Sequence, residues 1–147
     1  MKNQALDSNE ESHFPFQGGC LCGRVRFALK RVGPAVICHC EQCRKAQGVA
    51  FACNFPISLD AFRLTRGEEA LASYGSSATK SRIFCSNCGS PLWSMRDGSS
   101  EIRIRTGCLD DTSAITPSAH IFARSCPNWA HIDDSLPRYE KFEPGRD

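Results

Sequence analysis

The clustering of the cysteines constrains this chain more than any other feature. Ten cysteines occur in 147 residues, and most lie in three short groups: C-x-C at 20–22, C-x-C-x-x-C at 38–43 and C-x-x-C at 85–88. Thiols so close in sequence cannot easily bridge to their immediate neighbours, because disulfide geometry is demanding. Tetrahedral zinc instead draws thiolate sulfurs to about 3.8 Å from one another. The grouping therefore predicts a zinc-binding domain.

The composition fits one domain in a reducing compartment. A chain of 147 residues with 41% hydrophobic and 23% charged residues has ordinary domain size and composition. The N-terminus, MKNQALDSNEESHFPF, lacks the apolar stretch of a secretory signal, and the longest apolar runs are too short to cross a membrane. We expect a cytoplasmic protein with reduced thiols and no membrane partner. Residues 1–13 are expected to be disordered, residues 14–143 to form the zinc-binding domain and residues 144–147 a flexible tail.

Alternating polarity predicts a mainly β domain. Apolar and polar residues alternate over 24–29, 49–57 and 102–105, which is typical of half-buried strands. Glycine and proline punctuate these segments. Helical patterns are scarce, and residues 41–47 and 58–64 are each expected to form one short helical turn. The pattern indicates antiparallel sheets whose loops carry the cysteines.

Two of the cysteine groups have the spacing of one closed metal site. In an ideal strand, residues two apart lie about 6.7 Å from each other, so Cys20 and Cys22 can share a zinc only where the backbone pinches. The neighbouring glycines permit that pinch. The CSNCG segment that contains Cys85 and Cys88 is typical of a zinc knuckle. Together these four thiols predict a structural zinc, and the alternative is two pairs of unligated core thiols.

The third group, Cys38, Cys40 and Cys43, supplies three ligands. Three protein ligands leave the fourth position of a tetrahedral zinc to water or substrate, as in catalytic sites. The alternative is a second structural zinc that a distant side chain completes. The candidates for that fourth ligand are His120, His39 and Cys108.

Charge counting favours thiol chemistry at the open site. Three thiolates leave a bound zinc with a net charge of about −1, which makes it a poor generator of hydroxide but suited to holding an incoming thiol as a thiolate. With both sites filled, the formal charge of +2 falls to about −1, because each thiolate adds one negative charge and each zinc two positive ones. We therefore expect two zinc ions per chain and no nucleic-acid partner.

The chain resembles the glutathione-dependent formaldehyde-activating enzyme family, which includes centromere protein V. The matching segments run in order as GGCLCGRVRF, CHCEQCRKAQG, FCSNCGSPLW, RTGCLDD, HIF with PNW, and LPRYEKF, from about residue 18 to residue 142. The resemblance implies a β-tent, a complex of small antiparallel sheets with zinc-binding loops. It also implies a structural zinc on Cys20, Cys22, Cys85 and Cys88 and a catalytic zinc on Cys38, Cys40 and Cys43.

The activity that the resemblance implies is the condensation of glutathione with formaldehyde to S-hydroxymethylglutathione, a carbon–sulfur lyase reaction. The partners would be a small thiol such as glutathione and a small aldehyde, and a homodimer is compatible with such a domain. The competing hypothesis is a non-catalytic binding module that zinc stabilises, because relatives of this fold serve interaction roles.

Three further residues are candidates for the catalytic site. His39, between two ligands, can act as a proton shuttle or orient the metal site, and Asp111 can act as an acid or base. Arg44 can bind a carboxylate of the thiol cosubstrate. Each has a structural alternative: a partly exposed structural histidine, a turn cap and a solvated surface arginine.

Overall fold

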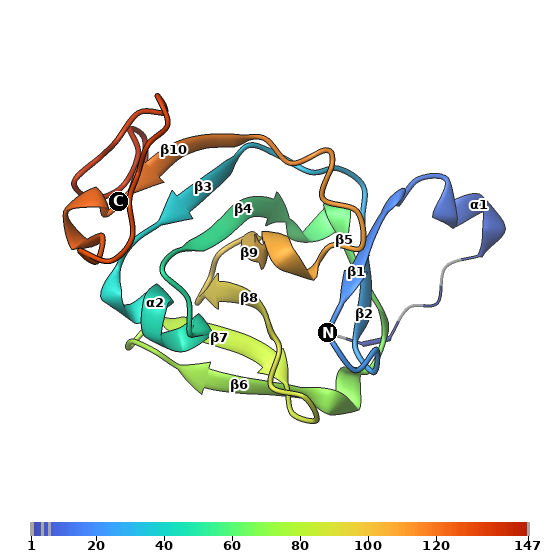
Figure 1. Cartoon of the computed structure of the whole chain (residues 1–147). Coiled ribbons are helices and arrows are strands. Elements are labelled where there is room, and N and C mark those ends of the chain that lie inside the picture. The colour runs from blue at the N-terminus through green and yellow to red at the C-terminus, as the bar shows by residue number, and fades with distance from the viewer. Residues whose placement is uncertain (1, 4, 6, 147) are drawn as a thin grey trace.

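The structure is a computed structural model that describes residues 2–3, 5 and 7–146. It contains two sheets (Figure 1). The smaller has the order β1 (Phe16–Gly19), β2 (Arg26–Leu29) and β5 (Phe62–Arg66). The larger has the order β10 (Pro117–Ile121), β3 (Ala35–Cys38), β4 (Ala52–Ser58), β9 (Glu101–Arg105), β8 (Pro91–Arg96), β7 (Lys80–Cys85) and β6 (Leu71–Gly75).

Helical structure is short, as the sequence predicts. The α-helices are α1 (Ser8–Glu11) and α2 (Glu41–Gln47). The 3-10 turns are η1 (Leu59–Ala61), η2 (Glu68–Ala70), η3 (Thr106–Cys108) and η4 (Ala123–Ser125). Helix α2 ends at Gly48, whose φ of 63° lies in the left-handed region that glycine adopts without strain. The mainly β fold class is confirmed. The turn expected over 58–64 contracts to η1, because β5 begins at Phe62.

One strand pair departs from the antiparallel expectation. Strand β10 runs parallel to β3 at the edge of the larger sheet, whereas the other pairs in both sheets are antiparallel. Sequence alternation cannot distinguish the two directions, since both place side chains with a period of two. In Figure 1 the larger sheet curls from β10 at the top to β6 at the bottom, with the smaller sheet on the right.

The main core lies between the two sheets. Phe27 of the smaller sheet stacks on Phe62, with ring centroids 5.7 Å apart, and meets the edge of Trp93 from the larger sheet at 6.1 Å. Ile102 and Ile104 are buried in this core, while Arg103 and Arg105, which alternate with them, point to the opposite face. The two-residue alternation of β9 thus divides an apolar face from a cationic one.

A second, smaller apolar cluster lies on that opposite face and holds the cysteine triplet. Cys38 and Cys43 are buried in it beside Ala52 and Ile121, with Phe142 packed against them. Cys38 pairs in register with Ala52 of β4, so that the triplet sits where β3 meets α2. This cluster surrounds one side of the triplet with apolar side chains.

Disorder or flexibility is expected at both ends of the chain. The disorder expected over 1–13 falls in part on residues 1, 4 and 6, which lie outside the described residues; within the described part, 8–11 form helix α1. In the expected flexible tail, residue 147 lies outside the described residues, whereas the guanidinium of Arg146 lies 4.4 Å from the centroid of the Phe142 ring.

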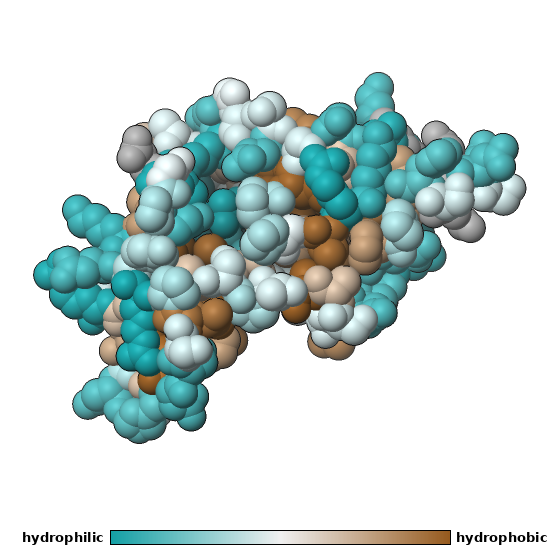
Figure 2. All heavy atoms as spheres, turned by 90° about the horizontal axis from the view of Figure 1, so that it is seen from above, coloured by the Kyte–Doolittle hydropathy of each residue, from teal (hydrophilic) through white to brown (hydrophobic). Residues whose placement is uncertain are grey.

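The surface carries no single broad apolar face in the view from above. Figure 2 shows hydrophobic residues gathered in separate spots among hydrophilic ones. Among the described residues, no helix has the length and apolarity that a membrane crossing requires.

Candidate metal centres

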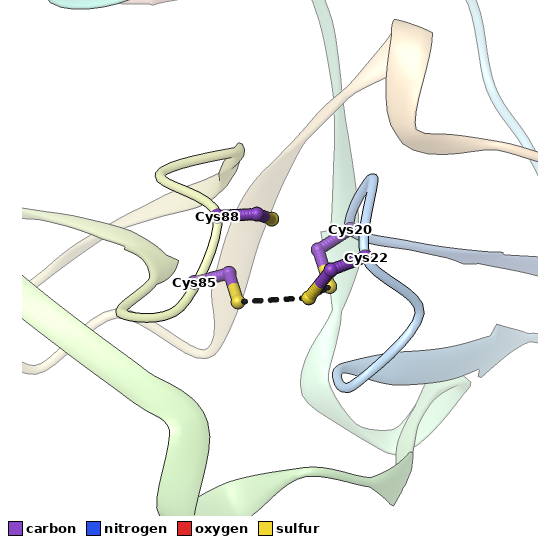
Figure 3. Close-up of side chains that lie close together, drawn as sticks. All are labelled: Cys20, Cys22, Cys85 and Cys88. Carbon is purple, nitrogen blue, oxygen red and sulfur yellow. Dashed lines mark hydrogen bonds between the residues drawn. The ribbon is translucent and has the colours of Figure 1, made fainter.

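Two loops bring together the four cysteines of the expected closed site. Cys20 and Cys22 lie between β1 and β2, and Cys85 and Cys88 lie at the end of β7 and in the turn that follows it (Figure 3). The sulfurs of Cys20 and Cys22 are 3.5 Å apart, and those of Cys22 and Cys85 are 3.8 Å apart. All four sulfurs lie within 4.8 Å of one another. These spacings match the sulfur separation that tetrahedral zinc requires.

Glycines close both loops. Gly23 and Gly89 each have a φ of 78°, which a residue with a Cβ adopts only at a cost. The amide of Val25 donates to the Cys20 sulfur at 3.2 Å. The Ser90 hydroxyl lies 3.2 Å from the Cys88 sulfur and lowers the pKa of that thiol to about 5. Burial instead raises the pKa of Cys85 to about 11. The loops thus present an S₄ donor set, which fits a structural zinc.

A strand–turn–helix step assembles the triplet. Cys38 ends β3, Cys40 is the N-cap of α2, and Cys43 lies in the first turn of that helix. The Cys40 sulfur accepts a hydrogen bond from the Cys43 amide at 3.3 Å, as serine and aspartate do at helix N-termini. The three sulfurs lie within 4.8 Å of one another. Among the described residues, no histidine, cysteine or carboxylate joins this group as a fourth member.

Two arginines face the triplet. Both terminal nitrogens of Arg82 lie 3.9 Å from the Cys43 sulfur, and Arg105 is buried nearby with 5% exposure. Hydrogen bonds from Cys38 and Cys40, together with these two guanidinium charges, hold the pKa of Cys43 well below its usual range. Sequence reasoning did not single out Arg105. The sequence does indicate which way Arg105 points, because an arginine that alternates with core isoleucines must lie on the opposite face of the strand.

A cavity of about 700 Å³ opens beside the triplet, between α2 and strands β6–β8. Its cationic lining residues are Lys45, Arg82 and Arg105, and Tyr74 and Trp93 contribute aromatic walls. Arg82 belongs to both the cavity wall and the shell of Cys43. None of the three cysteines is among the described residues that line this cavity, so Arg82, which lies 3.9 Å from the Cys43 sulfur, links the cavity to the triplet.

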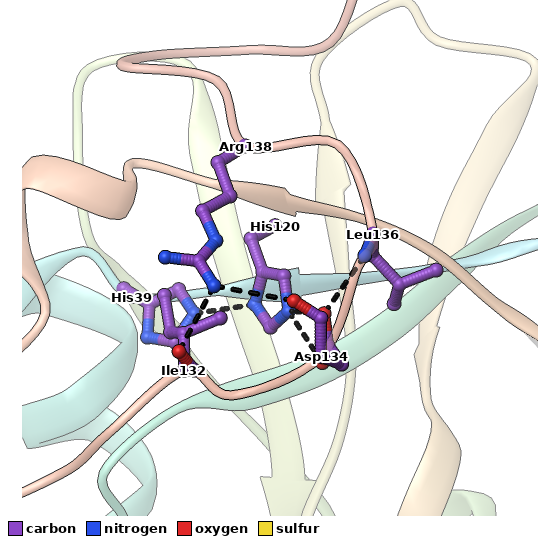
Figure 4. A network of polar contacts seen from close by, with 6 residues as sticks. All are labelled: His39, His120, Ile132, Asp134, Leu136 and Arg138. Carbon is purple, nitrogen blue, oxygen red and sulfur yellow. Dashed lines mark hydrogen bonds and ion pairs between the residues drawn. The ribbon is translucent and has the colours of Figure 1, made fainter.

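His39 belongs to a buried hydrogen-bonded chain (Figure 4). Its Nε2 lies 2.8 Å from Nδ1 of His120, and Nε2 of His120 lies 2.9 and 3.0 Å from the Asp134 carboxylate oxygens. Arg138 holds the loop that carries Asp134, because its guanidinium donates to the backbone carbonyls of Ile132 and Asp134 at 2.9 and 3.2 Å. These hydrogen bonds connect the end of β3 to β10 and to the loop that follows β10.

The proton positions in this chain follow from its partners. A carboxylate only accepts, so Nε2 of His120 carries the proton and Nδ1 accepts from Nε2 of His39. Burial is the main cause that lowers the pKa of His39. Its remaining nitrogen, Nδ1, is buried without a hydrogen-bond partner. The ring of His39 is thus directed toward β10, and the backbone between Cys38 and Cys40 is anchored there.

The remaining sequence candidates do not line the large cavity. Asp111 is exposed, and its carboxylate accepts from the amide of Ser113 at 2.8 Å, which makes a turn cap. Arg44 is half-buried on α2 and does not line the large cavity, whereas Lys45 does. The catalytic role of Asp111 and the substrate-binding role of Arg44 remain predictions.

Comparisons with known proteins agree on one family. Residues 15–125 match the profile of the family described as glutathione-dependent formaldehyde-activating enzyme. A Schizosaccharomyces pombe protein named an uncharacterized lyase is 33% identical over 82 residues, 53% of this chain and 56% of that protein. The chain thus spans little more than half of that relative. A putative glutathione-dependent formaldehyde-activating enzyme from Halomonas elongata is 29% identical over 127 residues, 80% of each chain.

A solved structure extends the similarity to the fold. The crystal structure of a Rhodobacter sphaeroides protein superimposes with a TM-score of 0.55 at 27% identity, over 64% of this chain and 87% of that chain.

Proposed function

Because the chain belongs to the glutathione-dependent formaldehyde-activating enzyme family, we propose that it is a zinc-dependent enzyme of the carbon–sulfur lyase type. It adds the thiol of glutathione, or of a similar cosubstrate, to formaldehyde or another small electrophile. The observation that carries the proposal is the cysteine triplet beside a cavity of about 700 Å³ with cationic walls. Family membership alone leaves the substrate open, since activity varies within a fold.

In this proposal the two cysteine groups have different roles, one structural and one catalytic. Cys20, Cys22, Cys85 and Cys88 would hold a structural zinc, and Cys38, Cys40 and Cys43 would hold the catalytic one. At the triplet, a bound zinc supplies a free coordination position and lowers the pKa of an incoming thiol. The lack of a fourth protein ligand among the described residues supports an open site.

The cavity wall accounts for the choice of an anionic thiol. Glutathione carries two carboxylates, and Arg82 and Arg105 offer the planar forks that pair with carboxylates in a bidentate manner. Lys45 adds a third positive charge to the cavity wall, where it also pairs with Glu41 at 2.9 Å. A cavity of this size lies within the range of small-molecule sites. Arg82 has the further role of stabilising negative charge on Cys43.

The reaction balances without an outside oxidant or reductant. The thiolate sulfur forms a bond to the carbonyl carbon, the carbon–oxygen π bond breaks, and the oxygen takes a proton equivalent to the one that the thiol released. We assign His39 to positioning: its bond to His120 holds the peptide between two ligands, and its ring is directed toward β10 rather than into the cavity.

The test is exchange NMR of formaldehyde with glutathione, using the zinc-loaded protein. We expect acceleration of the exchange by the protein and its loss in the Cys40→Ser variant. Serine keeps the N-cap of α2 while it removes a thiolate, so the fold should persist. The matched control is Cys126→Ser, since Cys126 lies outside both groups and its sulfur contacts the Ala130 carbonyl at 3.4 Å. A folded, zinc-loaded protein that does not accelerate the exchange would instead support the non-catalytic binding module.

A further inference from the structure

A second cavity, of about 150 Å³, is lined by cations and by no cysteine. Strands β7, β8 and β9 form its floor, and the C-terminal segment supplies one wall. Its four basic lining residues are Lys80, Arg96, Arg103 and Arg146. The proposed thiol chemistry uses none of them.

Strand register explains why these cations meet. Lys80 pairs with Arg96 across β7 and β8, and Ser94 pairs with Arg103 across β8 and β9. Paired residues of antiparallel strands point to the same face. The face is the one opposite the main core, because Ile102 and Ile104, on either side of Arg103, are buried between the sheets.

The positive charge of this cavity exceeds the nearby negative charge. Among the described residues, Glu101 is the one acidic residue that lines it, and Glu143 is engaged with Arg146 at 3.2 Å. The ion pairs among described residues include none to Lys80, Arg96 or Arg103. Among the described residues, and with both glutamates counted, the cavity keeps two uncompensated positive charges.

Arg103 is held in place with an unused donor. Its Nε donates to the side-chain oxygen of buried Asn54 at 2.6 Å, while its Nη2 is buried without a hydrogen-bond partner. Burial, and next the charge of Arg146, lower the pKa of Arg103 to about 10. Burial likewise lowers the pKa of Lys80. Buried donors are normally paired, so this group of cations is arranged for a ligand that brings negative charge.

We propose that this cavity binds a dianionic phosphate group, either as inorganic phosphate or as the head of a phosphate monoester. The two charges of the group match the two that the cavity leaves uncompensated. Guanidinium forks bind phosphate oxygens in a bidentate manner, and an ammonium adds a point charge. The cavity also has room for a tetrahedral anion, since a single water needs only about 10–15 Å³ of comparable space.

The test is calorimetric titration of the zinc-loaded full chain with inorganic phosphate, at low ionic strength and without sulfate. We expect saturable binding at one site. Arg96→Gln and Lys80→Gln should each weaken it by about tenfold, the scale of one charge-assisted hydrogen bond. Arg124→Gln is the matched control, because Arg124 is an exposed arginine that pairs with Glu140 outside the cavity. A titration that does not saturate, or equal weakening in the control, would overturn the proposal.

Two further measurements exclude a merely structural role and a second carboxylate site. Lys80→Gln should leave the melting temperature in phosphate-free buffer unchanged or raised, because it relieves repulsion among like charges; a clear fall would assign Lys80 to the fold. Methyl phosphate should compete with inorganic phosphate if the ligand is a monoester. If neither methyl phosphate nor inorganic phosphate binds, the site is refuted. Displacement of phosphate by glutathione would show that the cavity binds the cosubstrate's carboxylate and would overturn the proposal.

Discussion

Replacing His120 with alanine should destabilise the folded protein by about 3–6 kcal/mol. His120 is 4% exposed and bonds to His39 on one nitrogen and to Asp134 on the other. Its loss leaves the Nε2–H of His39 buried and unpaired, in a ring whose Nδ1 already has no partner. That unpaired donor costs about 1–3 kcal/mol, and the cavity left by the imidazole costs about 2–3 kcal/mol more.

The assay is urea denaturation of the zinc-loaded protein under reducing conditions. With an m-value of about 1–3 kcal/mol per molar urea, the midpoint should fall by roughly 2 M. His131→Ala is the control, since His131 is exposed and surface substitutions usually change stability by less than about 0.5 kcal/mol. If His120→Ala cost less than about 1 kcal/mol, as a surface change does, the buried chain would not anchor β3 to β10 as argued.

Three other predictions test separate parts of the account. Gly67→Ala should destabilise strongly, because Gly67 has a φ of 92° and a Cβ there would lie 2.2 Å from a backbone carbonyl oxygen; Gly107→Ala, with nothing within 4 Å of its Cβ, should be nearly neutral in the same thermal melts. The bond from Arg26 lowers the pKa of Asp110, so the stability it contributes is present above its unfolded pKa of about 4 and is lost as the pH falls through the lower folded value. Asp110→Asn should lower the free energy of unfolding by under about 1 kcal/mol at pH 7, because the Arg26–Asp110 pair is partly exposed. A loss of stability that persists at pH 2 would show that it does not come from the ionised Asp110 carboxylate. Arg82→Gln should raise the KM for glutathione more than it lowers kcat in the exchange assay; an unchanged KM would remove Arg82 from the cosubstrate site.

Local spacing predicted which cysteines gather into groups, and contacts across the sheet were harder to foresee. The C-x-x-C of Cys85 and Cys88 specifies a turn within four residues, and the alternation around Ile102 specifies which face is buried. The meeting of Arg82 and Arg105 at Cys43 depends on the order of strands far apart in the sequence. That order is set by packing of the whole sheet, which a period of two does not encode.

The histidine chain was missed for a related reason. His39 and His120 were each considered alone, and the parallel pairing of β3 with β10 brings them together. Asp134 comes from a loop beyond β10, where the sequence carries no period to indicate its direction. A buried hydrogen-bonded network of this kind can be recognised only when the positions of the three segments that form it are known.

The most direct test of the central claim, one closed and one open zinc site, is zinc K-edge absorption combined with metal content per chain. The account predicts two zinc ions, one with four sulfur neighbours and one with three sulfurs and a single exchangeable oxygen or thiol ligand. Added glutathione should bring the average shell of the second zinc toward four sulfurs. Two sites with four protein ligands each, before any thiol is added, would contradict the open site and the thiol chemistry built on it.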